Sequence, residues 1–486
     1  MHRHRHSCVA GGLAALLILL CPMHLSSQTG LSSQTAPDFR QARDEAVRTL
    51  QALIRIDTSN PPGNETRLAE HLKAILDREG IASEIVALQP ARGNLIARIQ
   101  GNGRKKPILL TGHMDTVGVE RDKWTVDPFE GGIQNGYVYG RGARDDKDDL
   151  AAMLEIFLLI HRQNPGRQKL ALDRDIIFLA VAGEEGTPQV GMDYVVEHHW
   201  PKVESEFALN EGGSIPVRDG KVRYVAVGTA QKALARARLV ARGVSGHGSV
   251  PRMDNAIGRL AAAVGRLMEY QPTMRLNETT RTFFERLATI SPPEEAFLFT
   301  HLNDPGVGKL IEETLRRSGN RAYVTYNSML RTSITPTLIQ GGFRNNVIPA
   351  EAEATLDIRA LPDENLDAFF AELRRVVDDP AVEVIALPRY RPIPPIAPLG
   401  SEMFRALEKA QAVVFPGAIT LPEMSTGSND AAQLLAKGVQ AYGVGAPGTD
   451  EDAEGAHGND ERVSVEGLGQ YVEFLYRAVV EVAGAR

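Results

Sequence analysis

The sequence predicts an α/β fold that carries a smaller inserted unit. Over residues 37–231, amphipathic helical patterns alternate with short apolar runs, which is typical of a layered α/β domain. From residue 232 to residue 388 the order of elements becomes βαββαβ, which predicts a small sheet covered by helices on one face. The α/β pattern then returns at residues 389–486. We therefore expect residues 232–388 to be an insertion into a single larger domain.

The first segment opens with two predicted helices. Apolar residues recur at three- and four-residue steps from Phe39 to Ile54, and the consecutive Pro61 and Pro62 cannot continue a helix. The same spacing from Leu68 to Leu76 predicts a second helix that stops at Gly80. Predicted strands follow at 81–88, 94–100, 108–111 and 175–182, with a buried helix at 150–161.

The elements of the inserted unit are predicted from the alternating and helical spacing of its apolar residues. Between its first helix and its second strand lies a helical, proline-containing excursion at 271–331, in which we find no chemical motif. A proline-rich linker at 388–398 leads back to the larger domain. The predicted strands are 233–243, 332–342, 352–360 and 382–385, and the predicted helices are 255–270 and 365–377.

Length and composition exclude some classes of protein. A chain of 486 residues exceeds what one core normally supports, so two or three domain-sized units are expected. The content of 43% hydrophobic and 24% charged residues is that of an ordinary soluble globular protein. A formal charge of -7, without a long run of Lys or Arg, argues against a nucleic-acid partner.

Residues 1–36 are predicted to be an export signal with a short leader. The basic stretch His2–His6 precedes an apolar run, Val9–Cys21, that is too short to span a bilayer comfortably. We expect a periplasmic or extracellular protein, with an uncleaved membrane anchor as the alternative. Both cysteines, Cys8 and Cys21, lie in this segment. The mature protein would then lack thiols, which excludes a cysteine nucleophile and a cysteine-type zinc site.

The predicted strand at 108–111 ends at a glycine and leads to His113 and Asp115. Side chains two residues apart on an extended backbone project to the same side, so Asp115 can reach the His113 imidazole. A carboxylate in that position fixes the tautomer of a metal-binding histidine. A purely structural hydrogen-bonded pair is the alternative, and the choice depends on further ligands elsewhere.

Further acids and one histidine stand at strand ends or in glycine-flanked loops. Paired glutamates at the end of a buried strand are costly unless they bind a cation or act as an acid and a base. Asp148 and Asp149 are also explained by favourable charge at a helix N-terminus, which accounts less well for Asp145. The candidate positions are Asp145, Asp146, Glu184, Glu185, Glu211 and His457.

Two histidines and several carboxylates, without cysteine, form a donor set that suits zinc or a similar first-row ion. The number of donors suits two ions that share one bridging carboxylate. Two ions about 3.5 to 4 Å apart hold a hydroxide and polarise an amide carbonyl. Two-metal amide hydrolysis is therefore the first chemical hypothesis.

Short motifs recur along the chain at the candidate positions and in the inserted unit. The motifs are Gly-His-Met-Asp-Thr-Val at 112–117, Gly-Arg-Gly-Ala-Arg-Asp-Asp-Lys at 140–147, Gly-Glu-Glu-Gly at 183–186, Asn-Glu-Gly-Gly at 210–213, Ser-Gly-His-Gly-Ser-Val-Pro at 245–251, Asn-Val-Ile-Pro at 346–349 and the loop of His457. These motifs make the sequence similar to the M20 family of metallopeptidases, which includes aminoacylase-1, carboxypeptidase G2 and the succinyl-diaminopimelate desuccinylases. The resemblance implies a catalytic α/β zinc-peptidase domain with an inserted βαββαβ lid of the dimerisation type. The segment 271–331 resembles the enlarged lids of the carboxypeptidase S and PM20D1-like branch.

The resemblance also implies a role for each position in the larger domain. Asp145 would bridge two zinc ions, the choice over Asp146 resting on the register of the motif. Glu184 would be the general base, and Asp115 the support of His113. His113 and Glu211 would complete the ligands of one ion, and Glu185 and His457 those of the other. Where the family commonly places a glycine after this motif, the chain has Asp148 and Asp149.

In the lid, the resemblance implies that His247 reaches the active site of a partner subunit and stabilises the oxyanion. A structural or merely exposed histidine is the alternative. Asn346 and Arg359 resemble residues that hold the carbonyl and the carboxylate of a substrate, although Arg359 could equally be a solvated surface residue. Arg344 is a second candidate for the carboxylate. The loop 425–430 resembles a segment that faces the substrate.

We therefore expect an exported hydrolase with two Zn²⁺, for which Co²⁺ or Mn²⁺ could substitute. The expected substrate is a small peptide or an N-acylated amino acid with a free carboxylate, and a homodimer through the lid is expected. Two alternatives remain at this point. One is a two-zinc aminopeptidase of the M28 type, which would lack the inserted lid. The other is a non-catalytic binding protein on the same scaffold.

Overall fold

The computed structural model describes residues 37–164, 171–304 and 306–484. The predicted signal segment, residues 1–36, lies outside this range. Within the described residues, no helix has both the length and the apolar character that a membrane span needs. The described chain contains one large sheet, a smaller four-stranded sheet and three short two- or three-stranded sheets.

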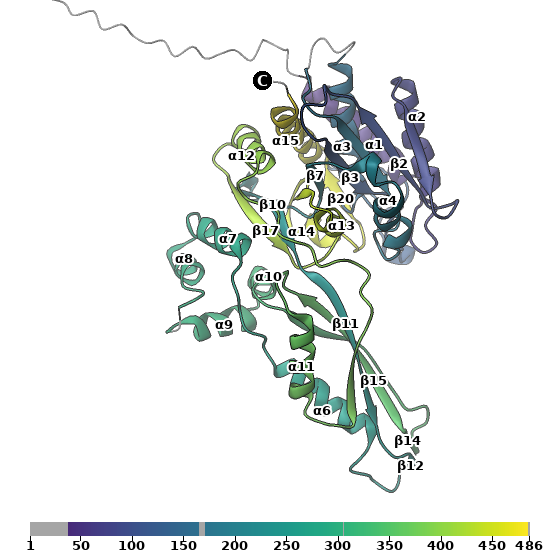
Figure 1. Cartoon of the computed structure of the whole chain (residues 1–486), viewed down its shortest axis with the longest axis vertical. Coiled ribbons are helices and arrows are strands. Elements are labelled where there is room, and N and C mark those ends of the chain that lie inside the picture. The colour runs from purple at the N-terminus through teal and green to yellow at the C-terminus, as the bar shows by residue number, and fades with distance from the viewer. Residues whose placement is uncertain (1–36, 165–170, 305, 485–486) are drawn as a thin grey trace, which may run out of the picture. The chain divides into compact units, whose positions relative to one another are not determined.

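The larger domain is built on an eight-stranded sheet with the order β1-β2-β6-β3-β7-β18-β10-β17 (Figure 1). The central strands β6, β3, β7 and β18 run parallel to one another, whereas the β1–β2, β2–β6 and β10–β18 pairs are antiparallel. The strands are β1 (Ser83–Ala87), β2 (Gly93–Ile99), β3 (Ile108–His113), β6 (Ile176–Val181), β7 (Phe207–Glu211), β10 (Tyr224–Gln231), β17 (Ile419–Ser425) and β18 (Gln440–Val444).

The parallel strands bring the predicted site residues to one edge of this sheet. His113 is the last residue of β3, Glu211 is the last residue of β7, and Glu184 follows the end of β6 by three residues. Ligands of open α/β sheets bind beside the carboxyl ends of parallel strands, because the chain leaves each strand on the same side. The topology therefore gathers residues that are about a hundred positions apart in the sequence.

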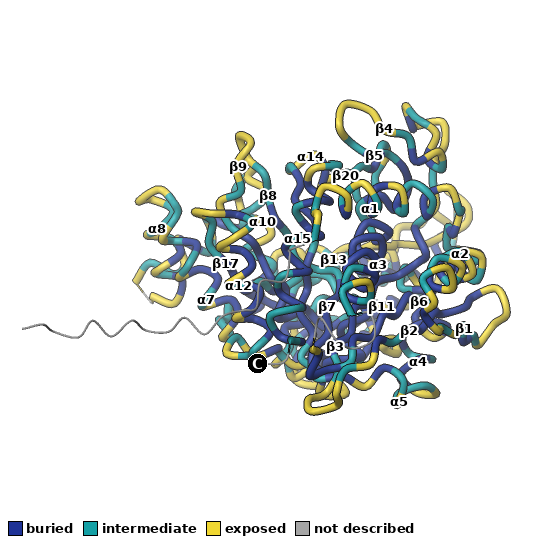
Figure 2. Tube along the Cα trace, turned by 90° about the horizontal axis from the view of Figure 1, so that it is seen from above, coloured by how far each residue is buried: buried dark blue, intermediate teal, exposed yellow. Residues whose placement is uncertain are grey.

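Helix α3 (Lys147–Arg162) packs against β3 and β6 and also against α1 (Phe39–Ile54) and α15 (Val465–Ala483). Because it has neighbours on several sides, most of its residues are buried, as the dark blue segments of Figure 2 illustrate for this part of the molecule. A helix that is apolar nearly all round requires such a position. The other helices of this domain are α2 (Glu65–Arg78), α4 (Met192–His198), α5 (Trp200–Val203), α12 (Glu402–Val414), α13 (Ala431–Ala436) and α14 (Asp450–Gly455).

The inserted lid has the predicted order of elements. Its antiparallel sheet has the order β13-β15-β11-β16, and alternate residues of β15 from Ala352 to Ala360 are buried. These residues form an apolar core with helices α6 and α11, so one face of the sheet is covered. The predicted α/β fold with a lid is confirmed, while the predicted domain boundaries stay predictions. The elements are β11 (Ala233–Arg242), α6 (Ala256–Glu269), β13 (Ser333–Gly341), β15 (Glu351–Ala360), α11 (Leu366–Val377) and β16 (Val382–Ala386).

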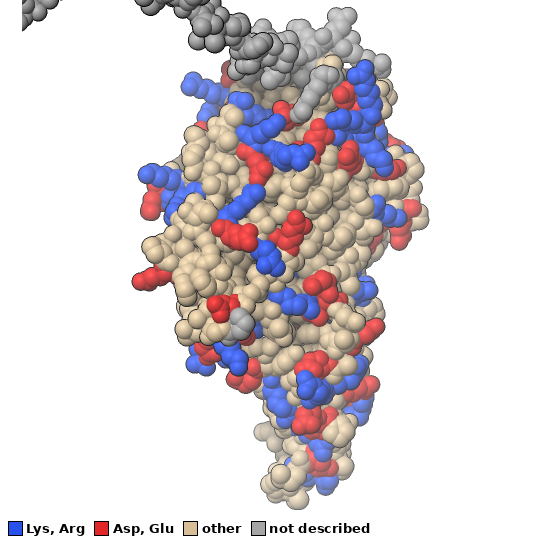
Figure 3. Space-filling model, turned by 60° about the vertical axis from the view of Figure 1, so that its left-hand side comes forward, with Lys and Arg blue, Asp and Glu red and all other residues tan. Residues whose placement is uncertain are grey.

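The outer face of the lid sheet carries charged side chains of both signs. Arg238 lies 3.5 Å from Glu353 across the β11–β15 pair, and Arg242 lies 3.1 Å from Glu383 across the β11–β16 pair. Figure 3 shows Lys, Arg, Asp and Glu interspersed on one face of the molecule, including its narrow lower part. Such exposed pairs contribute little stability, about 0 to 1 kcal/mol each, but keep the uncovered face of the sheet soluble.

The excursion at 271–331 forms four helices with an apolar cluster of their own. Phe283, Phe284 and Phe299 pack there with Leu421 and Met424 of β17. The excursion therefore packs against the edge strand of the larger sheet, although the chain enters it from the lid. Covering an edge strand removes its tendency to pair with other chains. The helices are α7 (Glu278–Ala288), α8 (Pro293–Thr300), α9 (Gly308–Arg317) and α10 (Arg321–Met329).

Candidate active site

The carboxylate of Asp145 lies between two imidazoles. Its Oδ1 is 3.0 Å from His113 Nε2, and its Oδ2 is 3.0 Å from His457 Nε2. His113 comes from the end of β3, Asp145 from the loop before α3, and His457 from the loop between α14 and β20 (Arg462–Ser464). Each oxygen of one carboxylate thus faces a different histidine, which is the arrangement that a carboxylate bridging two cations requires.

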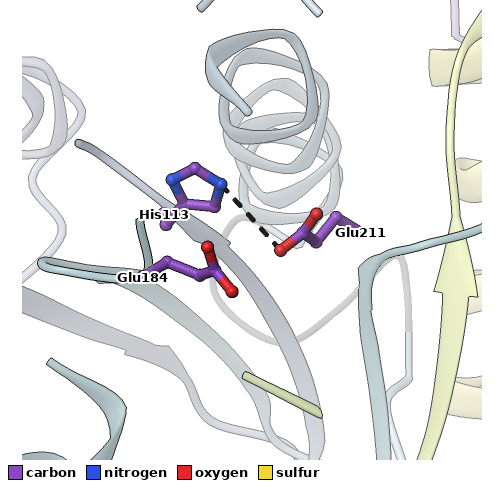
Figure 4. Close-up of side chains that lie close together, drawn as sticks. All are labelled: His113, Glu184 and Glu211. Carbon is purple, nitrogen blue, oxygen red and sulfur yellow. Dashed lines mark ion pairs between the residues drawn. The ribbon is translucent and has the colours of Figure 1, made fainter. Parts of the chain in front are cut away.

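Each imidazole has a second carboxylate beside it. Glu185 Oε1 is 2.9 Å from His457 Nε2, and Glu211 Oε1 is 3.9 Å from His113 Nε2, the pair marked by a dashed line in Figure 4. Glu184 faces the same space, because its carboxylate lies within 4.8 Å of ligand atoms of both His113 and Glu211. The structure therefore brings together all five predicted metal ligands and the predicted general base.

The charges at the site fit bound cations. Burial raises the pKa of Glu211 well above its usual range, and the nearby Glu184 carboxylate raises it further. Burial alone would also raise the pKa of Asp145, but the hydrogen bonds with His113 and His457 hold it below its ordinary value. Gathering these carboxylates costs free energy that divalent cations would offset. Imidazole nitrogens and carboxylate oxygens are a donor set suited to zinc.

The tautomer of His113 follows from its hydrogen bonds. Its Nδ1 lies 3.0 Å from the backbone carbonyl oxygen of Asp115, which can only accept. Nδ1 therefore carries the proton, and in the neutral ring Nε2 has a free lone pair that faces Asp145 and Glu211. This is the form in which a histidine binds a metal ion.

Asp115 acts on the site in a second way that the sequence did not indicate. Its carboxylate lies 3.5 Å from His113 Nδ1, farther than its own carbonyl oxygen. The same carboxylate accepts hydrogen bonds from the backbone N–H groups of Glu184 and Glu185 and from Asn60 Nδ2. The Asp115 carboxylate therefore positions the backbone of the paired glutamates, while the Asp115 carbonyl oxygen orients the His113 ring.

The chain is similar in sequence to proteins with named activities. Residues 109–481 match the family described as Peptidase family M20/M25/M40. A probable carboxypeptidase S-like 2 of Dictyostelium discoideum is 30% identical over 388 residues, which are 77% of this chain and 71% of that protein. The chain belongs to the M20 peptidase family. It is therefore an enzyme of the peptidase and amidohydrolase type, and the M28-type alternative is not favoured.

Longer alignments and solved structures agree with the M20 assignment. The human N-fatty-acyl-amino acid synthase/hydrolase PM20D1 is 27% identical over 498 residues, 96% of this chain and 95% of that protein. An M20 metallo-carboxypeptidase of Sulfolobus solfataricus has a TM-score of 0.68 at 19% identity, over 90% of this chain and 99% of that one. A dinuclear metal-binding M20 peptidase of Bacillus subtilis has a TM-score of 0.56 at 17% identity, over 91% and 98%. The two structures show the shared fold.

The loop that carries Asp145 in this M20 chain is held by Glu461, which the sequence analysis did not single out. The fully buried Glu461 carboxylate accepts hydrogen bonds from the backbone N–H groups of Gly142, Arg144 and Asp145 and from the Arg141 side chain. Its place in the sequence, four residues after His457, was the only available indication. Glu461 thus joins the two loops that supply Asp145 and His457.

A second residue that the sequence analysis missed is Arg391, in the proline-rich linker. Its Nη2 donates to Glu184 Oε1 at 2.6 Å, and its Nη1 donates to Asp430 Oδ1 at 2.9 Å. Nothing in the linker sequence marks this arginine, because an isolated Arg beside prolines is commonly exposed. Only the folded chain shows that it is buried beside the predicted base.

The neighbouring Asp146 has a different position from Asp145. Its Oδ2 accepts a hydrogen bond from the backbone N–H of His113 at 2.9 Å, and the residue is buried. The geometry therefore agrees with the choice of Asp145 as the residue between the histidines. Asp148 and Asp149 lie in the first turn of α3, as the helix-dipole interpretation requires, but both are buried.

The lid places His247 beside Asn346. β12 (Gly246–His247) pairs with β14 (Val347–Ile348), and the N–H of Gly248 donates to the Asn346 carbonyl oxygen at 2.8 Å. These short strands lie beyond the ends of β11 and β15, at the lower tip of the ribbon in Figure 1. Within the described residues, no hydrogen bond or ion pair links this exposed histidine to the predicted metal ligands of its own chain.

Other residues predicted to bind substrate have different surroundings. Arg359 on β15 pairs with Asp357 through two hydrogen bonds of 2.7 and 3.1 Å, so part of its guanidinium is already engaged. Arg344 is exposed near β14. The loop 425–430 adjoins the metal-site residues, because Asn429 Nδ2 donates to the Glu211 carbonyl oxygen at 3.1 Å.

Replacing Glu461 by Gln is expected to weaken metal binding. The amide has one oxygen in place of two, so it cannot accept all the N–H groups of the loop before α3. We expect zinc affinity to fall about 10- to 100-fold, the usual effect of losing a group that orients metal ligands. Titration against a competing chelator measures this. Glu466→Gln, whose side chain is 70% exposed, is the matched control. Unchanged affinity of Glu461→Gln would contradict the role.

Proposed function

We propose that this M20 enzyme hydrolyses the amide bond of a small peptide or an N-acylated amino acid with the help of two zinc ions. The position of Asp145 between His113 and His457 carries this proposal, because each oxygen of its carboxylate faces a different imidazole. His113, Glu211 and Asp145 would hold one ion, and Glu185, His457 and Asp145 the other. Co²⁺ or Mn²⁺ would be tolerated, since they accept the same nitrogen and oxygen donors.

Two divalent ions bound there would supply Lewis acidity to the scissile carbonyl and to the attacking water. Glu184 accepts a proton from that water as the oxygen bonds to the carbonyl carbon. The same carboxyl group then returns the proton to the amide nitrogen as the carbon–nitrogen bond breaks. Burial raises the pKa of Glu184 to about 8, although the Arg391 guanidinium beside it acts to lower it.

The substrate class is inferred from the relatives and from the lid. Proteins similar to this chain are named as a carboxypeptidase S-like protein, an N-fatty-acyl-amino acid synthase/hydrolase and a probable succinyl-diaminopimelate desuccinylase. All three names describe amide bonds beside an amino acid. We propose that Asn346 contacts the substrate carbonyl, and that Arg359 or Arg344 receives its free carboxylate.

We further propose that His247 works in a homodimer formed through the lid. Ser249 N–H donates to His247 Nδ1 at 3.1 Å, so Nδ1 accepts and the neutral ring carries its proton on Nε2. That N–H is suited to donate to the oxyanion of a tetrahedral intermediate. The edge strand β13 exposes Leu338 and Ile339 by 60% and 65%, which supports an interface on this side of the lid.

Glu184→Gln is expected to abolish turnover and to leave metal binding intact. The amide keeps the size of the side chain and can still accept from Arg391, but it cannot take a proton from water. We expect kcat to fall about 1000-fold or more. Steady-state kinetics and metal analysis of the purified protein measure both properties, with Glu466→Gln as the control. Turnover within tenfold of the unchanged protein would remove Glu184 from the mechanism.

A substrate panel tests the inferred class. The zinc-loaded protein is compared on N-acyl amino acids, dipeptides with a free or amidated carboxyl terminus, and aminoacyl anilides. We expect cleavage only where a free carboxylate lies beside the scissile bond, because the proposed recognition uses an arginine. Preferential cleavage of the anilides would instead indicate the specificity of an aminopeptidase.

Mixing two inactive variants tests whether His247 acts on a partner. His247→Ala chains keep their metal site, and Asp145→Asn chains keep His247. In a dimer of one chain of each kind, the intact metal site of the His247→Ala chain receives His247 from its partner, so one of the two sites works. If half of all dimers are of this kind, about a quarter of the activity should return. Mixing His247→Ala chains with chains carrying both changes is the control without recovery. No recovery in dimers verified by sedimentation would refute action between subunits.

A further inference from the structure

Arg391 connects the segment that returns from the lid to the predicted base. It lies in residues 387–401, which contain no helix or strand and join β16 of the lid to α12 of the larger domain. Although this segment is largely open to solvent at Arg389 and Tyr390, the Arg391 side chain is only 6% exposed. Burial of a guanidinium costs free energy unless its donors are hydrogen-bonded. The groups that accept from Arg391 therefore indicate its role.

The Arg391 guanidinium donates hydrogen bonds to two oxygen atoms of Glu184. Nη2 donates to Oε1 of the carboxylate at 2.6 Å and to the backbone carbonyl oxygen of the same residue at 3.1 Å. Contact with both the backbone and the side chain of one residue fixes the direction of that side chain. Among the hydrogen bonds of the described residues, Arg391 supplies the only side-chain donor to the Glu184 carboxylate.

The other end of the guanidinium is anchored in the larger domain. Nη1 donates to Asp430 Oδ1 at 2.9 Å, and Asp430 is 2% exposed at the start of α13. The Gln433 Oε1 atom of the same helix lies 3.5 Å from Nη1. Because Asp430 holds one side of the planar group, the other side is presented to Glu184 in one orientation. Arg has this fixed fork of donors, whereas Lys offers a single point charge.

We propose that Arg391 is a positioning residue that holds the Glu184 carboxylate in the orientation needed for proton transfer, with Asp430 as its anchor. The inference rests on the proposed role of Glu184 as the general base. Proton transfer requires the base within hydrogen-bond reach of the water, so a base that rotates freely loses rate without losing substrate affinity. If Arg391 only attached the segment 387–401 to the larger domain, its loss would lower folding stability and would not lower the kcat of the folded enzyme.

The first test separates kcat from KM in Arg391→Ala and Arg391→Lys. We expect Arg391→Ala to lower kcat about 50-fold with KM within threefold, and Arg391→Lys to lower it by about tenfold. Metal content and the temperature of thermal unfolding are measured on the same samples. Arg389→Ala, which changes an exposed arginine two residues away, should match the unchanged protein. Unchanged kcat in folded, metal-loaded Arg391→Ala would overturn the proposal.

Chemical rescue provides a readout that a structural clamp would not give. Guanidinium chloride at low millimolar concentration should restore part of kcat to Arg391→Ala in a saturable way, since the ion fits the vacated site between two carboxylates. Sodium chloride at equal ionic strength, and guanidinium added to Arg389→Ala, should have no such effect. Absence of rescue in folded Arg391→Ala would count against positioning by the guanidinium.

Removal of Arg391 leaves Asp430 buried without its cation, and the single variant can fail to fold for that reason. The double variant Arg391→Gln with Asp430→Asn removes both charges, so that position 430 no longer holds a buried carboxylate without its cation. Low kcat with normal KM in this folded variant supports the proposal, and normal kcat overturns it. If Glu184→Gln is inactive while these variants are fully active, only the role of Arg391 fails. If Glu184→Gln is active, the proposed function itself fails.

Discussion

Several carboxylates meet at one edge of the large sheet, and the surrounding structure provides for their charge. Asp145 is flanked by two imidazoles, Glu184 by a guanidinium, and Asp115 by backbone N–H groups. Parallel strands make this meeting possible, because His113 and Glu211 end neighbouring strands on the same side. The same crowding would be costly in a protein that bound no cation. The closeness of these negative charges is therefore the constraint on the site, because the loops must supply positive or N–H partners to each carboxylate.

The two histidines that are assigned different roles have opposite tautomers. His113 donates from Nδ1 to a carbonyl oxygen, so in the neutral ring Nε2 has the free lone pair that the proposed metal ligand needs. His247 accepts at Nδ1 from a backbone N–H, so the neutral ring keeps its proton on Nε2, which suits the proposed donation to an oxyanion. In both cases a neighbouring backbone group sets the tautomer. The identity of the side chain alone would not distinguish the two roles.

Much of the fold and of the site was predictable because it depends on local patterns and motifs. The βαββαβ order of the lid follows from alternation and helical spacing over short windows, and the structure reproduces it. The positions of the excursion helices were not predictable, since their apolar residues pack on β17, about a hundred residues further along the chain. Glu461 and Arg391 were missed for the same reason, because their contacts join distant segments.

The sequence by itself determined the family, the order of elements and the set of chemically able residues, because each of these depends on residue type and short spacing. Tertiary structure decided which acids lie together. It placed Asp145 between the imidazoles and turned Asp146 toward the backbone of His113. It also buried Arg391 against Glu184. Those outcomes depend on how strands and loops from separate parts of the chain approach one another, and no local pattern encodes that approach.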